Sequence, residues 1–363
     1  MVGDSCDVGR HGEGGLSAAT GVAPKRIPRA FTRQLTFVDI ERSVTMSGEN
    51  GISSEYSDSL NDITEDGSSA NGNASVNGAK GGDDRKVAVV TGATSGIGLA
   101  LAQHLHHSQN YRIALVGRNF DKGAKISSSF SDPSSAQFFQ CDVTSYQSQK
   151  EMFLSVWKTW GRIDLCCLTM GSAYDDCDYR KDGESAKTCQ GKDVEDMPAE
   201  PQLNDTEVCC KEVIYGVTLA VHFMRFNPKD SPSGETHAPK GKIIVNASIG
   251  EVVPHHTYTE YCVVKAAMIQ FVRGTAASCK QEKGVWLNCV SSESVAAPIM
   301  SDECVGAIGE ECFTSSSTIL AAHGVFINDQ TGEVGKVLEA LADKLCWYEL
   351  PELSNVDGSL TSI

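Results

Sequence analysis

The sequence predicts an α/β fold, a single doubly wound parallel sheet that follows a disordered N-terminal extension. From position 86 onward, short apolar runs alternate with amphipathic stretches, which is typical of β-α units. A glycine-rich turn at 91–98 joins the first apolar run to the first helical pattern. Residues 1–84 are rich in Gly, Ser, Asn and Asp, and such a composition buries too little apolar surface to offset its ordering entropy. We therefore expect a domain at 85–345 and a C-terminal tail at 346–363.

The pattern of apolar residues places each element in order. Strands are expected at 86–91, 112–116, 137–140, 164–168, 242–246, 285–288 and 336–341. Helices are expected at 97–106, 146–160, 206–225, 261–279 and 318–326. The stretches 173–204 and 227–240 are too hydrophilic for a core and are expected to be loops.

Composition narrows the class of partner. The chain has 363 residues, of which 40% are hydrophobic, and a formal net charge of -16. This charge argues against nucleic acid and anionic membranes as partners, because both attract basic surfaces. The most apolar stretch outside the strands, Val213 to Met224, is shorter than the roughly 20 residues of a membrane-spanning helix. We expect neither a nucleic-acid partner nor a membrane span.

The 14 cysteines are scattered through strand-like and helix-like segments. Asp4, Asp7 and Glu13 lie where a signal or transit peptide would be apolar or basic. We interpret the cysteines as reduced thiols of a cytoplasmic protein. The adjacent pairs at 166–167 and 209–210 lack the two-residue gap of metal-binding motifs, so no metal site is expected.

A dinucleotide-binding turn follows the first predicted strand. Gly92, Ser95, Gly96, Ile97 and Gly98 lie between this strand and the first helix. Glycines there let the backbone turn tightly and approach a pyrophosphate, whose charge then lies at the positive end of the helix. The alternative is a plain strand-to-helix turn. The strand before, the helix after and the three spaced glycines favour a Rossmann-type nucleotide site.

The end of the second strand indicates which nicotinamide cofactor is preferred. An NAD site offers a carboxylate to the ribose 2'-hydroxyl there, whereas this chain has Arg118 followed by Asn119. The guanidinium could pair with a 2'-phosphate, which favours NADP over NAD, although Arg118 could also be an ordinary solvated residue. Asp142 and Val143 follow the third strand, where a carboxylate can bind the adenine amino group.

A reactive constellation is predicted near the sixth strand. Tyr261 and Lys265 are four residues apart, so they share one helix face. The ammonium would favour the phenolate and lower the phenol pKa from about 10. Ser248 follows a strand, at the edge where open α/β sheets place ligands. A surface helix pair and a simple turn are the ordinary alternatives, but the three together behind the glycine turn favour catalysis.

These residues together resemble the short-chain dehydrogenase/reductase family over 86–341. Within it, residues 199–224 and Pro254 are similar to fungal relatives of 15-hydroxyprostaglandin dehydrogenase. The resemblance implies hydride transfer between nicotinamide and a carbonyl/alcohol pair. It makes Tyr261 the general acid/base, has Ser248 orient the substrate oxygen, and has Lys265 bind the nicotinamide ribose.

The resemblance also implies further contacts. Gly171 and Val295 match cofactor-contacting positions. Segments 173–204 and 290–317 would form variable substrate walls, and His255 and His256 could border the pocket or be solvated. The expected substrate is a small, fairly apolar ketone or secondary alcohol, for example a lipid-like molecule or a secondary metabolite. The family commonly forms homodimers or homotetramers through helices such as 261–279.

The chain departs from the family at several supporting positions. Leu168 and Thr169 stand where two asparagines are usual, and Cys209 stands at the helix asparagine that supports a proton-relay water. Ser292 and Glu293 stand where a Pro-Gly pair is usual, and Ala297 stands where a threonine commonly contacts the nicotinamide side. A thiol is a weak donor and acceptor. The alternative function is therefore a catalytically impaired protein that binds NADP(H) as a scaffold or sensor.

Overall fold

A mixed sheet with strand order β1-β9-β8-β7-β6-β5-β2-β3-β4 organises the part of the chain that the structure describes. The structure, a computed structural model, describes residues 35–38, 84–132, 134–171, 203–228, 238–251, 259–292 and 314–349. Of residues 35–38, only the backbone is described. All these residues belong to one compact unit that begins at Leu35.

The strands from β4 to β8 are parallel, and β9 and β1 complete one edge in antiparallel pairs. Their bounds are β1 (Leu35–Val38), β2 (Val87–Thr91), β3 (Arg112–Gly117), β4 (Ala136–Gln140), β5 (Leu165–Leu168), β6 (Gly241–Ser248), β7 (Val285–Ser292), β8 (Val337–Leu341) and β9 (Lys344–Tyr348). The helices are α2 (Gly96–Gln109), α3 (Phe120–Ser129), α4 (Tyr146–Trp160), α5 (Lys211–Met224), α6 (Thr259–Lys283) and α8 (Ser316–Asn328), with the π-helical turn η4 (Thr206–Cys210) and the 3-10 turn η5 (Ile249–Glu251).

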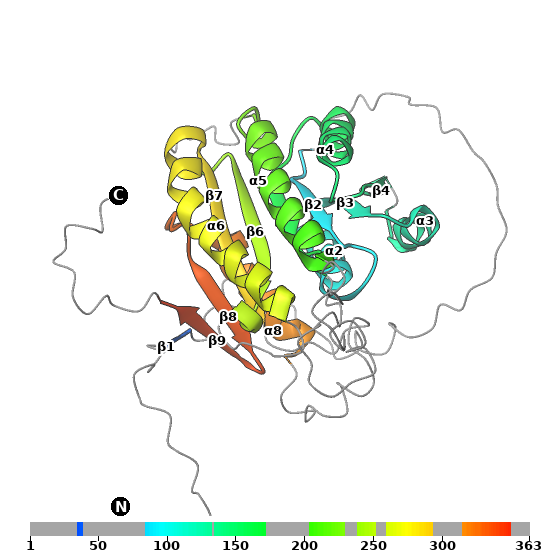
Figure 1. Cartoon of the computed structure of the whole chain (residues 1–363). Coiled ribbons are helices and arrows are strands. Elements are labelled where there is room, and N and C mark those ends of the chain that lie inside the picture. The colour runs from blue at the N-terminus through cyan, green and yellow to red at the C-terminus, as the bar shows by residue number, and fades with distance from the viewer. Residues whose placement is uncertain are drawn as a thin grey trace, which may run out of the picture. The chain divides into compact units, whose positions relative to one another are not determined.

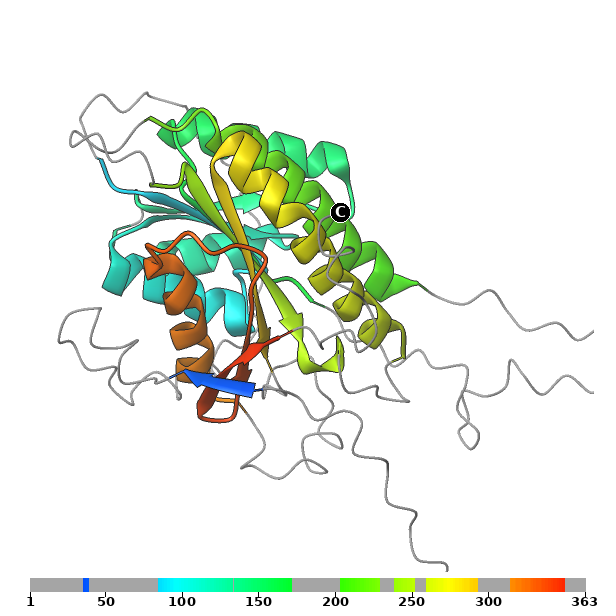
Figure 2. The ribbon, with the colours of Figure 1, turned by 90° about the vertical axis from the view of Figure 1, so that its left-hand side faces the viewer.

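Helices cover both faces of the sheet, as the predicted fold class requires (Figures 1 and 2). One apolar cluster packs α4, α5 and α6 against alternate residues of the strands, and a second packs α2, α3 and α8 against the others. Because each parallel strand is buried on both faces, its sequence is an almost continuous apolar run. This burial explains why all seven expected strands are found.

Three elements were absent from the prediction. Helix α3 buries only Gly123 and Ile126, so its periodicity is weak, and Asn119 caps it by accepting a hydrogen bond from the Lys122 N–H at 2.9 Å. Strands β1 and β9 lie wholly or mainly outside the expected domain at 85–345, and β1 falls within the expected N-terminal extension. The expected helix at 206–225 is also divided, because its first turn is the π-helical η4.

The order of the strands positions the site. The chain runs outward from β2 to β3 and β4, then returns to place β5 on the other side of β2. The loops that follow β2 and β5 therefore diverge, and open α/β sheets bind ligands in the crevice that such a divergence leaves. Among the described helices, none is both long and apolar enough to cross a membrane.

Candidate active site

The glycine turn after β2 has the backbone geometry of a phosphate cradle. Gly92 and Gly96 have φ values of +62° and +53°, a region that side chains disfavour. A Cβ on Gly98 would lie 2.5 Å from the Gly92 carbonyl oxygen and 2.8 Å from Thr169 Oγ1, so only glycine fits. The side chain of Ser95, at the N-cap of α2, makes no capping hydrogen bond. The tight turn before the start of α2 therefore fits the diphosphate of a nucleotide.

The other residues expected to contact the nucleotide lie along the same edge of the sheet. Arg118 is exposed directly after β3, and Ile97 is half-buried in the first turn of α2. Asp142 is exposed, and its Oδ1 accepts hydrogen bonds from the backbone N–H and the hydroxyl of Thr144 at 3.0 and 2.8 Å. Val143 is buried. Asp142 thus shapes its own turn with one carboxylate oxygen.

The three residues expected to react lie at the carboxyl end of β6 and the first turns of α6. Ser248 is the last residue of β6, and its Oγ lies 3.4 Å from the Gly250 N–H that donates to it. A Cβ on Gly250 would lie 3.4 Å from Cε1 of Tyr261, so the serine turn lies against the phenol ring. The Lys265 ammonium lies 5.3 Å from the centroid of the same ring. The structure therefore brings together the serine turn, the phenol and the amine.

Lys265 is a buried cation at the centre of this arrangement. It is 3% exposed, and its Nζ donates to the Asn246 carbonyl at 3.3 Å. A Cβ on Gly171 would lie 3.7 Å from the same Nζ, so the loop after β5 passes close to the amine. Val295, Ala297, His255 and His256 lie outside the described residues, as do most of the expected substrate walls.

Glu212 on α5 is a site residue that the sequence analysis missed. It is 0% exposed, and its Oε1 accepts hydrogen bonds from the Thr91 hydroxyl and, at 3.1 Å, from the Met170 N–H. Thr169 completes the network, because its N–H donates to Thr91 Oγ1 at 2.9 Å and its hydroxyl donates to the Thr91 carbonyl at 2.6 Å. The ends of β2 and β5 are thus tied by polar groups, although the asparagines expected at 168 and 169 are absent.

Burial raises the pKa of the Glu212 carboxyl to about 7, against the lowering effect of its two hydrogen bonds and of Lys265. Burial acts in the opposite direction on Lys265 and lowers its pKa. Interactions with Cys209, Tyr261 and Glu212 outweigh burial, and the pKa of Lys265 is raised overall. The ammonium therefore stays charged at the site.

Glu251 is a second carboxylate that the sequence analysis missed. Its Oε2 accepts a hydrogen bond from the Ser248 N–H at 3.1 Å, and its Oε1 accepts one from the Ser291 hydroxyl at 2.8 Å. Burial, helped by the neighbouring Glu339 carboxyl and opposed by the Ser291 hydrogen bond, raises the pKa of Glu251 to about 8. Glu251 therefore fixes the backbone of Ser248 from the side of β7.

The structure shows where two further residues that differ from the family pattern lie. Cys209 is fully buried in the π-helical η4, and it is one of the groups that raise the pKa of Lys265. Ser292 is the last residue of β7 and is buried. The sequence signal for Glu212 was present but weak: it is a carboxylate on the face of α5 that also carries the buried residues Val213, Gly216 and Ala220.

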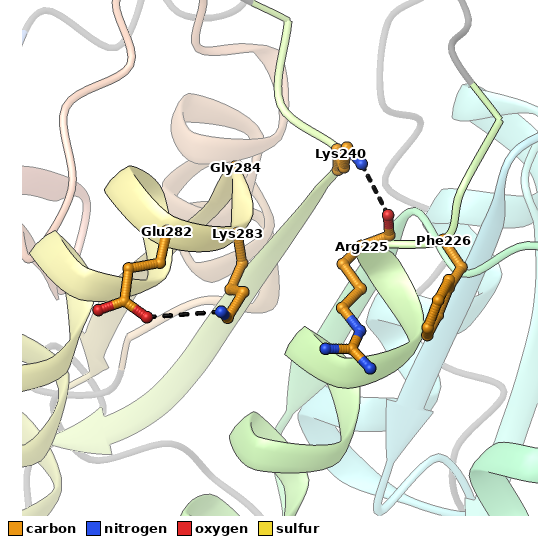
Figure 3. A pocket seen from close by; sticks show the side chains of 6 residues that line it. All are labelled: Arg225, Phe226, Lys240, Glu282, Lys283 and Gly284. Carbon is orange, nitrogen blue, oxygen red and sulfur yellow. Dashed lines mark hydrogen bonds and ion pairs between the residues drawn. The ribbon is translucent and has the colours of Figure 1, made fainter.

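A surface hollow of about 570 Å³ lies elsewhere, at the amino ends of β6 and β7 (Figure 3). Two of its polar contacts are internal: the Lys240 Nζ donates to the Arg225 carbonyl at 2.7 Å, and Lys283 pairs with Glu282 at 3.5 Å. Ser248 is at the opposite end of β6. The hollow is therefore separate from the candidate site.

Comparison with known proteins decides the family. The family model for short chain dehydrogenases matches residues 86–304, which include the glycine turn, Ser248, Tyr261 and Lys265. The chain belongs to the short-chain dehydrogenase/reductase family. As a member of this family, it is an oxidoreductase that acts on CH–OH groups with a nicotinamide cofactor.

Three relatives illustrate the similarity. The short-chain dehydrogenase/reductase prx6 of Penicillium rubens is 37% identical over 280 residues, which cover 74% of this chain and 88% of the relative. The 15-hydroxyprostaglandin dehydrogenase [NAD(+)] of Rattus norvegicus is 28% identical over 59% of this chain and 70% of the relative. The 5'-hydroxyaverantin dehydrogenase of Dothistroma septosporum is 30% identical over 52% of this chain and 60% of the relative. The resemblance inferred from the motifs is confirmed.

Proposed function

We propose that this short-chain dehydrogenase/reductase uses NADP(H) to interconvert a ketone and a secondary alcohol on a small, fairly apolar molecule. The observation that carries the proposal is the gathering of Ser248, Tyr261 and Lys265 next to Gly171, at the crevice that the glycine turn opens. Relatives named for hydroxyprostaglandin and hydroxyaverantin support a hydroxyl-bearing organic substrate.

Each side chain has a distinct task in this mechanism. A bound nicotinamide would supply or accept the hydride. The Tyr261 hydroxyl gives a proton to the substrate oxygen during reduction and takes it back during oxidation. The Ser248 hydroxyl, held by the Gly250 turn, donates a hydrogen bond to the same oxygen. Lys265 places a fixed positive charge beside the phenol ring, and its ammonium would bind the ribose of the nicotinamide nucleotide.

The mechanism is tested by Tyr261→Phe. This substitution keeps the ring against Gly250 and removes only the proton-transferring hydroxyl. We expect turnover of any ketone reduced by the wild-type protein with NADPH to fall at least about a hundredfold, which is the ordinary contribution of a general acid. Nucleotide affinity, measured by fluorescence titration, should change little.

Tyr215→Phe is the matched control, because the Tyr215 ring packs edge-on against Tyr146 at the start of α4. Unchanged turnover in the Tyr261 variant would refute the mechanism. If NADPH raised the melting temperature while no ketone or alcohol in a broad panel reacted, the scaffold or sensor function would replace it.

The choice of NADP(H) rests on Arg118. The residue is exposed directly after β3, where the ribose of a bound nucleotide would lie, and Asn119 beside it is occupied in capping α3. A guanidinium there can pair with a 2'-phosphate. Several relatives are named as NAD(+) enzymes. The cofactor proposed for this chain differs from theirs, and the difference rests on one side chain, that of Arg118.

Arg118→Ala tests this preference. We expect the dissociation constant for NADPH to rise about tenfold or more, the effect of losing one charge-assisted hydrogen bond, while that for NADH stays within about twofold. Both constants would be measured by nicotinamide fluorescence at one fixed ionic strength. Equal losses for the two nucleotides, or tighter wild-type binding of NADH, would contradict the NADP preference.

A further inference from the structure

The loop that follows β5 approaches both Glu212 and Lys265. Glu212 Oε1 accepts from the Met170 N–H at 3.1 Å, and the next residue, Gly171, approaches the Lys265 Nζ so closely that a Cβ there would lie 3.7 Å away. Thr91, the last residue of β2, donates its hydroxyl to the same Glu212 oxygen. One carboxyl group therefore contacts both loops of the crevice, and the second of these loops passes close to the amine.

The second oxygen of this carboxyl gives an independent observation. Glu212 Oε2 is buried and has no hydrogen-bond partner among the described residues. A buried carboxylate without a partner is costly unless an opposite charge compensates it. Lys265 is the cation whose charge the Glu212 carboxyl feels, and each group shifts the pKa of the other toward its charged form. The pair explains why α5 tolerates a carboxylate on its apolar face.

We propose that Glu212 is a positioning residue of the active site: it is the buried counter-charge of Lys265 and clamps the loops after β2 and β5 that would hold the nucleotide. The inference rests on the proposed function for its catalytic consequence. The clamp itself concerns the fold of this chain and is measurable without any substrate. Glu212 touches neither substrate nor cofactor in this role and acts through Lys265, Thr91 and Met170.

The groups that face Glu212 define its pH dependence. They are Lys265 on α6, Cys166 on β5, Cys141 after β4, and the hydroxyl of Thr91. Burial raises the pKa of both thiols, so they stay neutral in the physiological range. Lys265 is the charged member of this set. The charge of Glu212 therefore changes near neutral pH against a constant positive neighbour.

Glu212→Gln separates charge from hydrogen bonding, because glutamine keeps an acceptor oxygen and nearly the same volume. The matched control is Glu207→Gln, the same change one turn earlier on an exposed side chain that pairs with Lys211. We expect the dissociation constants for NADPH and NADH to rise about tenfold in the first variant and to stay unchanged in the second. Tighter binding, as simple relief of repulsion between a carboxylate and an anionic nucleotide would give, would overturn the proposal.

A kinetic readout distinguishes positioning from a purely structural role. Because burial raises the pKa of Glu212 to about 7, the charge of this carboxyl changes near neutral pH. The kcat/KM of the wild type should therefore change between about pH 6 and pH 8, and this change should be absent from Glu212→Gln. A structural residue would lower stability and rate without altering the pH profile. An unaltered pH profile together with wild-type nucleotide affinity would refute the positioning role.

A double-variant cycle keeps the inference separate from the proposed function. Urea midpoints at pH 8 would be compared for the wild type, Glu212→Gln, Lys265→Met and the double variant. The double variant should lose clearly less than the sum of the two single losses, even if no nucleotide binds and no substrate reacts. Additive losses would overturn the pairing. Failure of Glu212→Gln to fold would also overturn it, because the residue would then be structural.

Discussion

At the scale of single residues, two carboxyl groups, those of Glu212 and Glu251, contact the backbone of the site. Glu251 connects the Ser248 backbone to the Ser291 hydroxyl, and in β8 Glu339 lies directly opposite Ser291. The like charge of Glu339 and burial both disfavour ionisation of Glu251, and its pKa is raised to about 8. The orientation of Ser248 is therefore tied to a group that is protonated at neutral pH.

This raised pKa predicts how stability depends on pH. A carboxyl whose pKa is higher in the folded than in the unfolded protein stabilises most when both states are protonated, below about pH 4.5, and this contribution is lost as pH rises to about 8. Glu251→Gln should remove the loss. Between pH 5 and pH 9, the unfolding free energy of the variant should rise by roughly 2 kcal/mol relative to that of the wild type. This is about half of what the full pKa shift would give, because the residue is half-buried.

Urea unfolding at pH 5, 7 and 9 measures this difference in unfolding free energy. Glu282→Gln is the control, because Glu282 is exposed and pairs with its neighbour Lys283 at 3.5 Å. A difference between Glu251→Gln and wild type that does not change with pH would show that the carboxyl does not titrate in this window.

At the scale of elements, the sequence predicted what depends on local pattern. The parallel strands were found because burial on both faces makes them continuous apolar runs, and Gly98 was found because only glycine allows α2 to approach the Gly92 carbonyl so closely. Helix α3 was missed because it buries few side chains. Strand β1 was missed because it pairs with β9, about 310 residues later in the chain. A pairing over such a distance cannot be inferred from the local pattern of apolar residues.

The same distinction separates the predicted and missed parts of the site. Tyr261 and Lys265 are neighbours on one helix, and their spacing alone placed them on one face. Glu212 and Glu251 become site residues only when α5 packs over β2 and β5, and when β7 lies beside β6. Burial of a carboxylate is a property of the packed molecule, and a helix with one acidic residue on its apolar face gives only a weak signal.

At the scale of the whole molecule, β1 covers an edge that the sheet would otherwise expose. It pairs with β9 in antiparallel register from Leu35 opposite Tyr348 to Val38 opposite Leu345. An uncovered strand edge offers free N–H and C=O groups to other chains. Deletion of residues 1–38 should therefore cause concentration-dependent self-association, whereas deletion of residues 1–34 keeps β1 and should not.

Sedimentation velocity over a range of concentrations measures the association, and hydrogen exchange locates its cause. Amide protons of β9 should exchange at least about tenfold faster in the longer deletion, since the edge loses its partner strand, while those of β6 and β7 in the centre of the sheet should be unaffected. If the two deletions behaved alike in both measurements, β1 would contribute nothing to the protection of this edge. Strand β9 would then be the edge strand of the sheet.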